Sequence, residues 1–207
     1  MHPKLEAGEL SVSTATHDYL FRPSLAAMAS LGSPAEIVEL FALLHSQPAI
    51  HPAYPALSYR QWERDVLSAS YDVLAACCDD DVSPLLGYVG SRYGSWIPGA
   101  MPSEDMPHLA RSLMRHGITG NVKLRGKPKS ADYSDEFHAK DFVATAIAHL
   151  GLSEDDAWNM TMTSFSAAMQ SKFGKPENNV DDLIDSHDAD MAWLDGVNKL
   201  RDKKVSK

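Results

Sequence analysis

The stretch SPAEIVELFALL, residues 33–44, decides the class of fold. Ser33 is followed by Pro34, and Glu36 stands three residues after the serine, which is the signature of a capping box at the start of a helix. Apolar side chains then recur at helical spacing through the rest of the stretch. The segment therefore predicts an amphipathic helix that ends near His45.

A small β-hairpin is predicted before this helix. Residues 8–13 alternate polar and apolar side chains, and the stretch DYLFR at 18–22 is followed by Pro23, as is typical of strands and their boundaries. A two-stranded hairpin is marginally stable alone in water. We therefore expect it to lie on the short apolar helical face that begins at Leu25 and includes Met28.

Proline and glycine divide the next part of the chain. Residues 46–57 hold three prolines, a density that disfavours regular helix and predicts an extended strap or linker. A second capping box at residues 58–61 predicts a long amphipathic helix that reaches about Cys78. Residues 82–106 mix glycine and proline with aromatic side chains, which predicts a long ordered loop.

Capped helices are predicted again in the rest of the chain, because serine, threonine or aspartate precedes apolar residues at helical spacing and glycine follows them. Residues 177–195 carry seven carboxylates and no lysine or arginine, and apolar residues from Met191 to Leu200 could mark one more helix. The predicted N-caps are Ser103, Ser134 or Asp135, Ser153 and Thr163, and the predicted stops are Gly117, Gly151 and Gly174.

These patterns together predict a mainly α protein, a helical bundle with a small N-terminal β-hairpin. We expect three parts. Residues 1–117 form the hairpin and an N-terminal helical domain, and residues 118–134, in which lysine and arginine alternate with other residues, form a basic flexible linker or loop. Residues 135–207 form a C-terminal helical domain with the acidic tail segment.

Composition excludes several classes of function. The 207 residues hold 28 acidic and 19 basic side chains, a net charge of −9, which argues against general binding to nucleic acid. No apolar run is long enough for a membrane span, and the start MHPKLE has no apolar h-region. We therefore expect a protein that stays in the cytosol. The basic strip 123–129 is the one plausible contact for a polyanion, or for an acidic helix.

No catalytic, cofactor or metal site is predicted. His45 and His51 are six residues apart across the proline-rich strap, and the cluster at 185–190 lacks the glycine and terminal glutamate of a calcium loop. Cys77 and Cys78 are expected to be reduced thiols, because a disulfide between neighbours is strained. The sequence has no nucleophile elbow and no phosphate-binding glycine motif. A helix-turn-helix in the C-terminal third is disfavoured relative to a plain helical bundle, because the carboxylates at 154–156 would face phosphates.

Two segments resemble known sequences. The first contains a short strand and then YLFRPS (19–24), AMA (27–29) and EIVELF (36–41). The second contains AIAHLGLS (146–153), AWNMT (157–161) and Phe165. Both are similar to segments of the lambda-type tail assembly chaperones of long-tailed bacteriophages, the first to their opening and the second to their extension domain. The two segments cover about 65 residues, and residues 46–133 resemble no family that we can place.

The resemblance implies a non-enzymatic role. Such chaperones coat the tape-measure protein, bring major tail-tube subunits to it, and are absent from the finished virion. They act in the cytoplasm of the bacterial host, and self-association is a further option. Many of these families make a short and a long product through a programmed ribosomal slip, whereas here one chain carries both kinds of segment.

Apolar residues on the predicted helices are the candidate contacts with a partner. The alternative is ordinary core, because apolar stripes at helical spacing usually face inward. A structural tail completion or connector protein of the virion, and a small regulatory or host-takeover protein, are the rival functions. The candidate partner-binding residues are Leu40, Phe41, Leu44, Trp62, Trp158, Phe165 and Met169.

Overall fold

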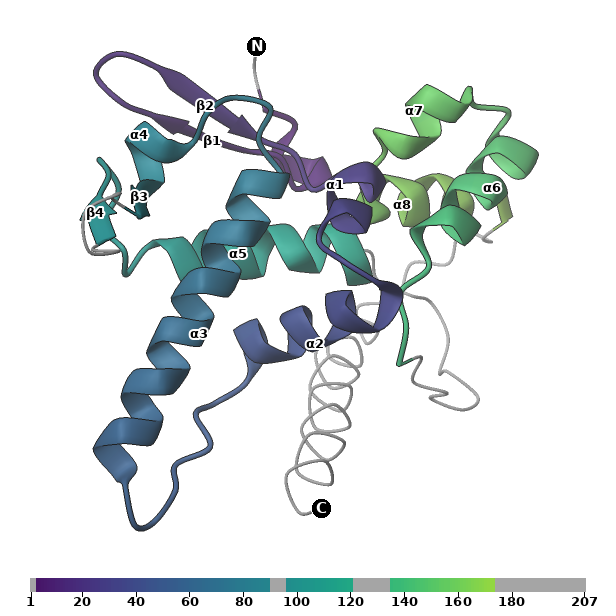
Figure 1. Ribbon diagram of the computed structural model, residues 1–207. Helices are drawn as coiled ribbons and strands as arrows, with labels where there is room; N and C mark the ends of the chain where they lie inside the picture. Colours follow the sequence, from purple (N-terminus) through teal and green to yellow (C-terminus); the bar gives the residue numbers. More distant parts are fainter. Residues whose placement is uncertain (1–2, 90–95, 121–134, 174–207) are drawn as a thin grey trace, which may run out of the picture.

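The structure, a computed structural model, describes residues 3–89, 96–120 and 135–173 (Figure 1). Within these ranges the chain is mainly α, with eight α-helices and two small antiparallel strand pairs, as the sequence predicted. The elements are η1 (Leu5–Ala7), β1 (Leu10–Ser13), β2 (Asp18–Phe21), α1 (Leu25–Ser30), α2 (Pro34–His45), α3 (Pro55–Ala76), α4 (Ser83–Leu86), β3 (Gly87–Val89), β4 (Trp96–Pro98), α5 (Met106–Met114), η2 (Arg115–Thr119), α6 (Ala139–Leu150), α7 (Glu154–Trp158) and α8 (Met162–Phe173).

The predicted N-terminal hairpin is confirmed. β1 pairs antiparallel with β2, so that Leu10 lies opposite Phe21. The turn is closed by Thr14, whose hydroxyl accepts a hydrogen bond from the His17 backbone N–H at 3.0 Å. Phe21 is fully buried and also bridges to Cys78 at the end of α3. One face of the hairpin is therefore part of the core.

Helix α2 begins as the sequence predicted. The Ser33 hydroxyl accepts a hydrogen bond from the Glu36 backbone N–H, and the Glu36 carboxylate accepts one from the Ser33 backbone N–H at 2.8 Å. This reciprocal pair satisfies two backbone donors that the helix itself leaves without partners. The buried residues of the helix are Ile37, Phe41 and Leu44.

The predicted start of α3 is wrong by one turn. The helix begins at Pro55, and Ser58 lies inside its first turn, where its hydroxyl donates to the Tyr54 carbonyl at 3.1 Å. Proline is well tolerated at the first helical position, because the N–H that it lacks would have no partner there. The extended strap is therefore shorter than predicted and ends at Tyr54.

The segment predicted as an ordered loop contains a short helix, α4, and the strand pair β3–β4. The close approach of two backbones explains Gly99, because a Cβ at this position would lie 2.2 Å from the Leu85 carbonyl oxygen. The backbone N–H of Met101 donates to that same oxygen at 2.8 Å. Pairing of this kind depends on contacts between distant residues, so local sequence patterns do not reveal it.

Helix α5 differs from its prediction at both ends. It begins at Met106 rather than after a Ser103 cap, and the chain continues past Gly117 as the π-helix η2 until Gly120. Gly117 serves close packing instead of ending a helix, since a Cβ there would lie 2.5 Å from the sulfur of Met28. Gly120, with φ of 72°, ends the helical run.

The C-terminal helices confirm some of the predicted boundaries and correct others. Gly151 ends α6 in the left-handed conformation, and the Ser153 hydroxyl caps α7, both as predicted. Helix α6 begins at Ala139, four residues after Asp135. Helix α8 is capped by Thr161, whose hydroxyl accepts from the Ser164 N–H at 3.1 Å, and not by Thr163. The predicted stop at Gly174 and the predicted helix from residue 191 lie outside the described residues.

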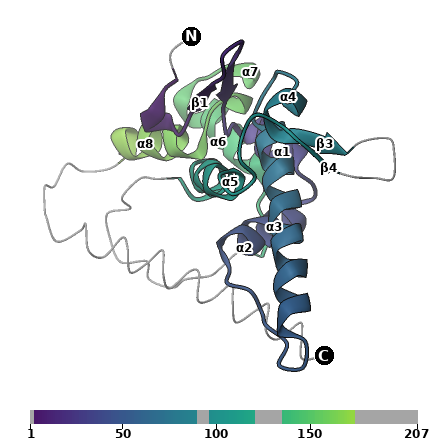
Figure 2. The ribbon, with the colours of Figure 1, turned by 90° about the vertical axis from the view of Figure 1, so that its left-hand side faces the viewer.

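One buried apolar cluster joins both ends of the described chain. The second half of α3 packs across α5, while α6, α7 and α8 lie against α1, η1 and η2 (Figures 1 and 2). The predicted linker overlaps η2 at residues 118–119, and residues 121–134 lie outside the described residues. The three-part division of the chain stays a prediction.

Candidate protein-binding surface

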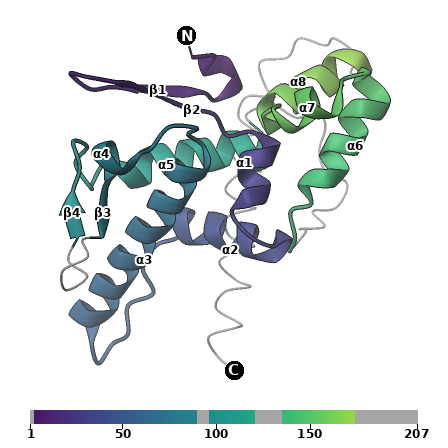
Figure 3. The ribbon, with the colours of Figure 1, turned by 45° about the horizontal axis from the view of Figure 1, so that its top comes forward.

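Helix α3 extends beyond the body of the protein. It has 22 residues, a length of about 33 Å. Its five buried residues all lie from Val66 onwards, and residues 55–65 contain none. Figures 1 and 3 show this first half running away from the other helices, connected to α2 by the strap. We call residues 50–67 the α3 arm.

The tip of the arm is held by its own hydrogen bonds. The backbone N–H of Tyr54 donates to the His51 carbonyl at 3.1 Å, and that of Ala53 donates to Nδ1 of the His51 ring at 3.2 Å. The Ser58 hydroxyl accepts from the His51 backbone N–H at 3.3 Å. The rings of His51 and Tyr54 are stacked 6.0 Å apart. The turn is thus ordered without packing on the body.

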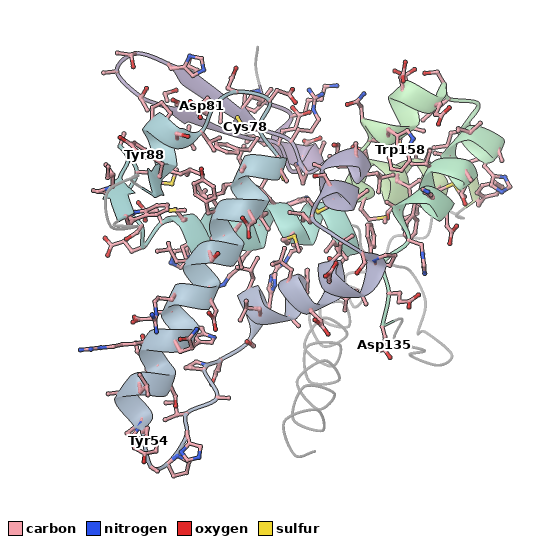
Figure 4. The ribbon with its side chains drawn as sticks, viewed as in Figure 1. Tyr54, Cys78, Asp81, Tyr88, Asp135 and Trp158 are labelled. Carbon is pink, nitrogen blue, oxygen red and sulfur yellow. The ribbon has the colours of Figure 1, made fainter. Side chains whose placement is uncertain are left out.

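Four large apolar side chains are exposed on this arm. Tyr54 is 65% exposed and Leu57 is 62% exposed, and Ile50 and Tyr59 are exposed as well. Tyr54 lies at the far end of the arm (Figure 4). Fully burying a side chain of this size stabilises by about 1.5–3 kcal/mol. A partner chain that covered these side chains would therefore gain the free energy of burying them.

A shallow groove of about 490 Å³ runs along one face of the arm. Its lining residues are Leu57, Arg60, Glu63, Arg64 and Leu67. Four of the five follow one another at intervals of three and four residues, so they share a helix face. The groove therefore combines two leucines with two guanidinium groups, and we call it the α3 groove.

The two arginines of the α3 groove form no ion pair within the described residues. Arg64 donates from Nη2 to the Gln61 side-chain oxygen at 2.8 Å, and the Gln61 nitrogen donates to Asp65 at 2.8 Å. These polar links run along the exposed surface of the helix. Both guanidinium groups can thus donate hydrogen bonds to a carboxylate of a partner.

The apolar face continues from the arm to the β3–β4 pair. Tyr71 lies one turn beyond Leu67, and its ring meets that of Trp96 edge to face, with centroids 5.8 Å apart. Trp96, Ile97 and Tyr88 are exposed on the strand pair. Figure 4 shows Tyr88 on this pair, beside the upper part of α3. Contiguous exposed apolar side chains with arginine among them are typical of protein-binding surfaces.

Trp62 lies on the opposite side of the arm from the α3 groove. It is half-buried against the core, and its ring lies 5.8 Å from that of Tyr59. The indole Nε1 is buried and has no hydrogen-bond partner within the described residues. Nε2 of His45 is also buried and also lacks a hydrogen-bond partner within these residues. An unsatisfied buried donor costs about 1–3 kcal/mol.

The seven predicted contact residues do not form one surface. Phe41, Leu44 and Phe165 are buried in the core, and the other four, Leu40, Trp62, Trp158 and Met169, are half-buried. They fall into one set on α2 and α3 and another on α7 and α8, and Figure 4 shows Trp158 far from Tyr54. Their role in binding stays a prediction.

Sequence reasoning missed the exposed apolar residues at the tip of the arm. The proline-rich strap was expected to reach residue 57, so Tyr54 and Leu57 were not considered as part of a helix face. Pro55 was the available signal, because proline at the first helical position would have moved the helix start back by one turn.

The residues of the first resembling segment hold the fold together. Arg22 donates from Nε to the Glu9 carboxylate at 2.8 Å, and Glu9 is buried. The Ser24 hydroxyl caps α1, and its backbone forms an antiparallel bridge with Thr161 of the second segment. The Leu25 N–H donates to the Met160 carbonyl at 2.8 Å. The two resembling segments are therefore in direct contact.

The arrangement of the metal-ligating and nucleophilic side chains in the described residues decides what chemistry they can support. No group of three histidine, cysteine or acidic side chains that could hold a metal ion occurs in it. Burial raises the pKa of the Cys77 thiol well above its usual range, with a smaller contribution from Cys78, whose own pKa burial also raises. A thiol that stays protonated is a poor nucleophile. None of the described helices is long and apolar enough to cross a membrane.

Residues 21–187 match the model of a family of unknown function, DUF6246. The chain belongs to this family. The DUF6246 match begins at the last residue of β2 and includes the whole α3 arm and the β3–β4 pair. No curated protein and no solved structure matches the chain.

Proposed function

We propose that this DUF6246 protein is a non-enzymatic tail assembly chaperone of a long-tailed bacteriophage. In the cytoplasm of the bacterial host it binds the tape-measure protein and recruits major tail-tube subunits to it. The observation that carries the proposal is the α3 arm, a projecting helix with exposed tyrosine and leucine side chains and two arginines that lack ion-pair partners within the described residues.

The arm suits a helical partner. A tape-measure protein that is not yet enclosed by the tail tube exposes apolar stripes along its helices. The spacing of Leu57, Arg64 and Leu67 on α3 would let a second helix lie alongside, with its apolar stripe on the leucines. Tyrosine and arginine dominate the energetics of many protein interfaces. The α3 arm therefore has the composition and the shape that such binding requires.

The contact between the two resembling segments also supports the proposal. Ser24 pairs with Thr161, and α1 packs against α6 and α7. In the chaperone family the corresponding segments belong to the opening and to the extension domain. Here they are parts of one apolar core, so a single chain could supply both in a fixed relation.

Co-expression tests the proposal. The chain is expressed with the tape-measure protein, expected to be encoded by a long coiled-coil reading frame immediately downstream. We expect co-purification and a gain in tape-measure solubility, and both should be lost in the double variant Tyr54→Ser/Leu57→Ser.

Leu5→Ser is the matched control, because Leu5 is 66% exposed but lies on η1, away from the arm. Failure of the wild-type chain to co-purify with the tape-measure protein or to raise its solubility would contradict the proposal. Mass spectrometry of purified particles should find the chain absent, whereas its presence in a fixed ratio would identify a structural tail component instead.

A further inference from the structure

The α3 groove is an unpartnered face of defined chemistry. It places Arg60 and Arg64 between Leu57 and Leu67, and Glu63 is the one acidic residue in its lining. The ion pairs within the described residues all lie elsewhere, between Arg22 and Glu9 and on the segments around residues 17, 80 and 136–138. The chain has a net charge of −9, and two arginines that form no ion pair within the described residues suit an acidic occupant.

The same chain contains a segment of complementary chemistry. Residues 177–195 hold seven carboxylates and no lysine or arginine. Apolar residues recur among them at Val180, Ile184, Met191 and Leu194, at intervals of four, seven and three residues, which is helical spacing. The pattern predicts an apolar stripe flanked by negative charge, which is the counterpart of a groove with two leucines and two arginines.

The length of the chain permits this contact. Helix α8 ends at Phe173, and Asp185, in the middle of the acidic segment, is the twelfth residue after it. Twelve extended residues span up to about 40 Å. A compact body of 173 residues has a radius of gyration of about 16 Å. The segment can therefore reach across the body of its own chain.

We propose that the acidic segment 177–195 binds the α3 groove of the same chain, with its carboxylates on Arg60 and Arg64 and its apolar residues on Leu57 and Leu67. The segment then covers the face that a partner helix would use, and a partner binds by displacing it. This inference goes beyond the chaperone proposal, because it holds for any partner of the arm.

Paramagnetic relaxation in the full chain tests the contact. A nitroxide label is attached at Ser186→Cys, since Cys77 and Cys78 are buried. We expect the amide signals of residues 57–67 to lose at least half of their intensity. The loss should persist when the labelled chain is diluted with a tenfold excess of unlabelled chain, which distinguishes contact within one chain from contact between copies.

Charge variants test the chemistry. The double variant Arg60→Glu/Arg64→Glu should restore the intensities, and Arg60→Lys/Arg64→Lys should keep most of the loss. The matched control is Lys140→Glu, which changes an exposed cation on α6 and should have no effect. Adding Asp181→Arg and Asp185→Arg to the double glutamate variant should bring the signal loss back.

Three results would overturn the inference. One is full intensity at residues 57–67 in the labelled wild-type chain. Another is a signal loss that disappears on dilution, because the occupant would then be a second copy. The third is a loss of signal intensity at residues 57–67 that the double variant Arg60→Glu/Arg64→Glu does not reverse. No tape-measure protein enters these experiments, so their failure leaves the chaperone proposal standing.

Discussion

Glu9 is an acidic side chain with an exposure of only 5%, and its two oxygens accept from different donors. One accepts from Arg22 and the other from the Lys4 backbone N–H, each at 2.8 Å. Removing one partner of a buried ion pair costs more than the pair contributes, because the remaining charge keeps its desolvation penalty. This pair fixes η1 and the end of β2 relative to each other.

Arg22→Ala should therefore lower the free energy of unfolding by about 2 kcal/mol, a value reduced from that of a fully buried pair because Arg22 is one-third exposed. Urea denaturation measures the loss. Glu9→Gln/Arg22→Ala should recover part of it. Strictly additive effects of the two substitutions would contradict a coupled pair.

Two histidines make stability depend on pH near neutrality. Burial lowers the pKa of His45, with Arg115 and Arg111 contributing in the same direction, and burial also lowers the pKa of His116, with Arg115 contributing. The folded state therefore favours the neutral rings. Below the ordinary pKa of about 6.5, the unfolded chain binds protons that the folded chain does not bind.

Stability should accordingly decrease as the pH falls through about 6.5 towards the lowered pKa values of the folded state. We expect the free energy of unfolding to be smaller at pH 5.5 than at pH 7.5, with a weaker dependence in His45→Gln and His116→Gln. Denaturation at the two pH values measures this. An unchanged difference in both variants would rule out the two histidines as its cause.

At the scale of elements, the boundaries set by local hydrogen bonds were predictable and those set by distant contacts were not. The Ser33 box, the Ser153 cap and the Gly151 stop depend on neighbours within four residues. Strand pair β3–β4 and the π-helix η2 depend on close approaches to Leu85 and Met28. The exposure of the arm was also beyond local patterns, because it follows from where α5 stops covering α3.

The two serines that the sequence presents as caps should behave differently. Ser33→Ala should lower the free energy of unfolding by about 1 kcal/mol, because Ser33 caps α2. Ser58→Ala should lower it by less than about 0.5 kcal/mol, since Ser58 is inside the first turn of α3 and makes exposed hydrogen bonds. Thermal denaturation of both variants decides this, and equal losses would place a cap at Ser58 after all.

At the scale of the whole molecule, the first and last described helices share a core. Backbone contacts join Ser24 to Thr161 and Leu25 to Met160, and another joins Phe137 to Pro34. Such contacts hold the helices after residue 135 against the N-terminal part whatever connects them. The arm and the β3–β4 pair extend from this common body, so the described residues combine a closed core with an apolar face that they leave uncovered.

Limited trypsin treatment should cut first at the lysines and arginines of residues 118–134, as the sequence predicts. The two fragments should then elute together in size-exclusion chromatography, because the shared core holds them. Separate elution would show that the contacts between the two parts are too weak to make one unit. Resistance of all basic residues in this range would contradict the predicted linker or loop.

The central claim is that the α3 arm is the surface on which another chain is held. Amide hydrogen exchange of the protein, alone and in complex with the tape-measure protein, tests it most directly. The account predicts that protection on binding is concentrated in residues 50–67 and continues into β3 and β4. Protection confined to α6, α7 and α8, with unchanged exchange along the arm, would contradict it.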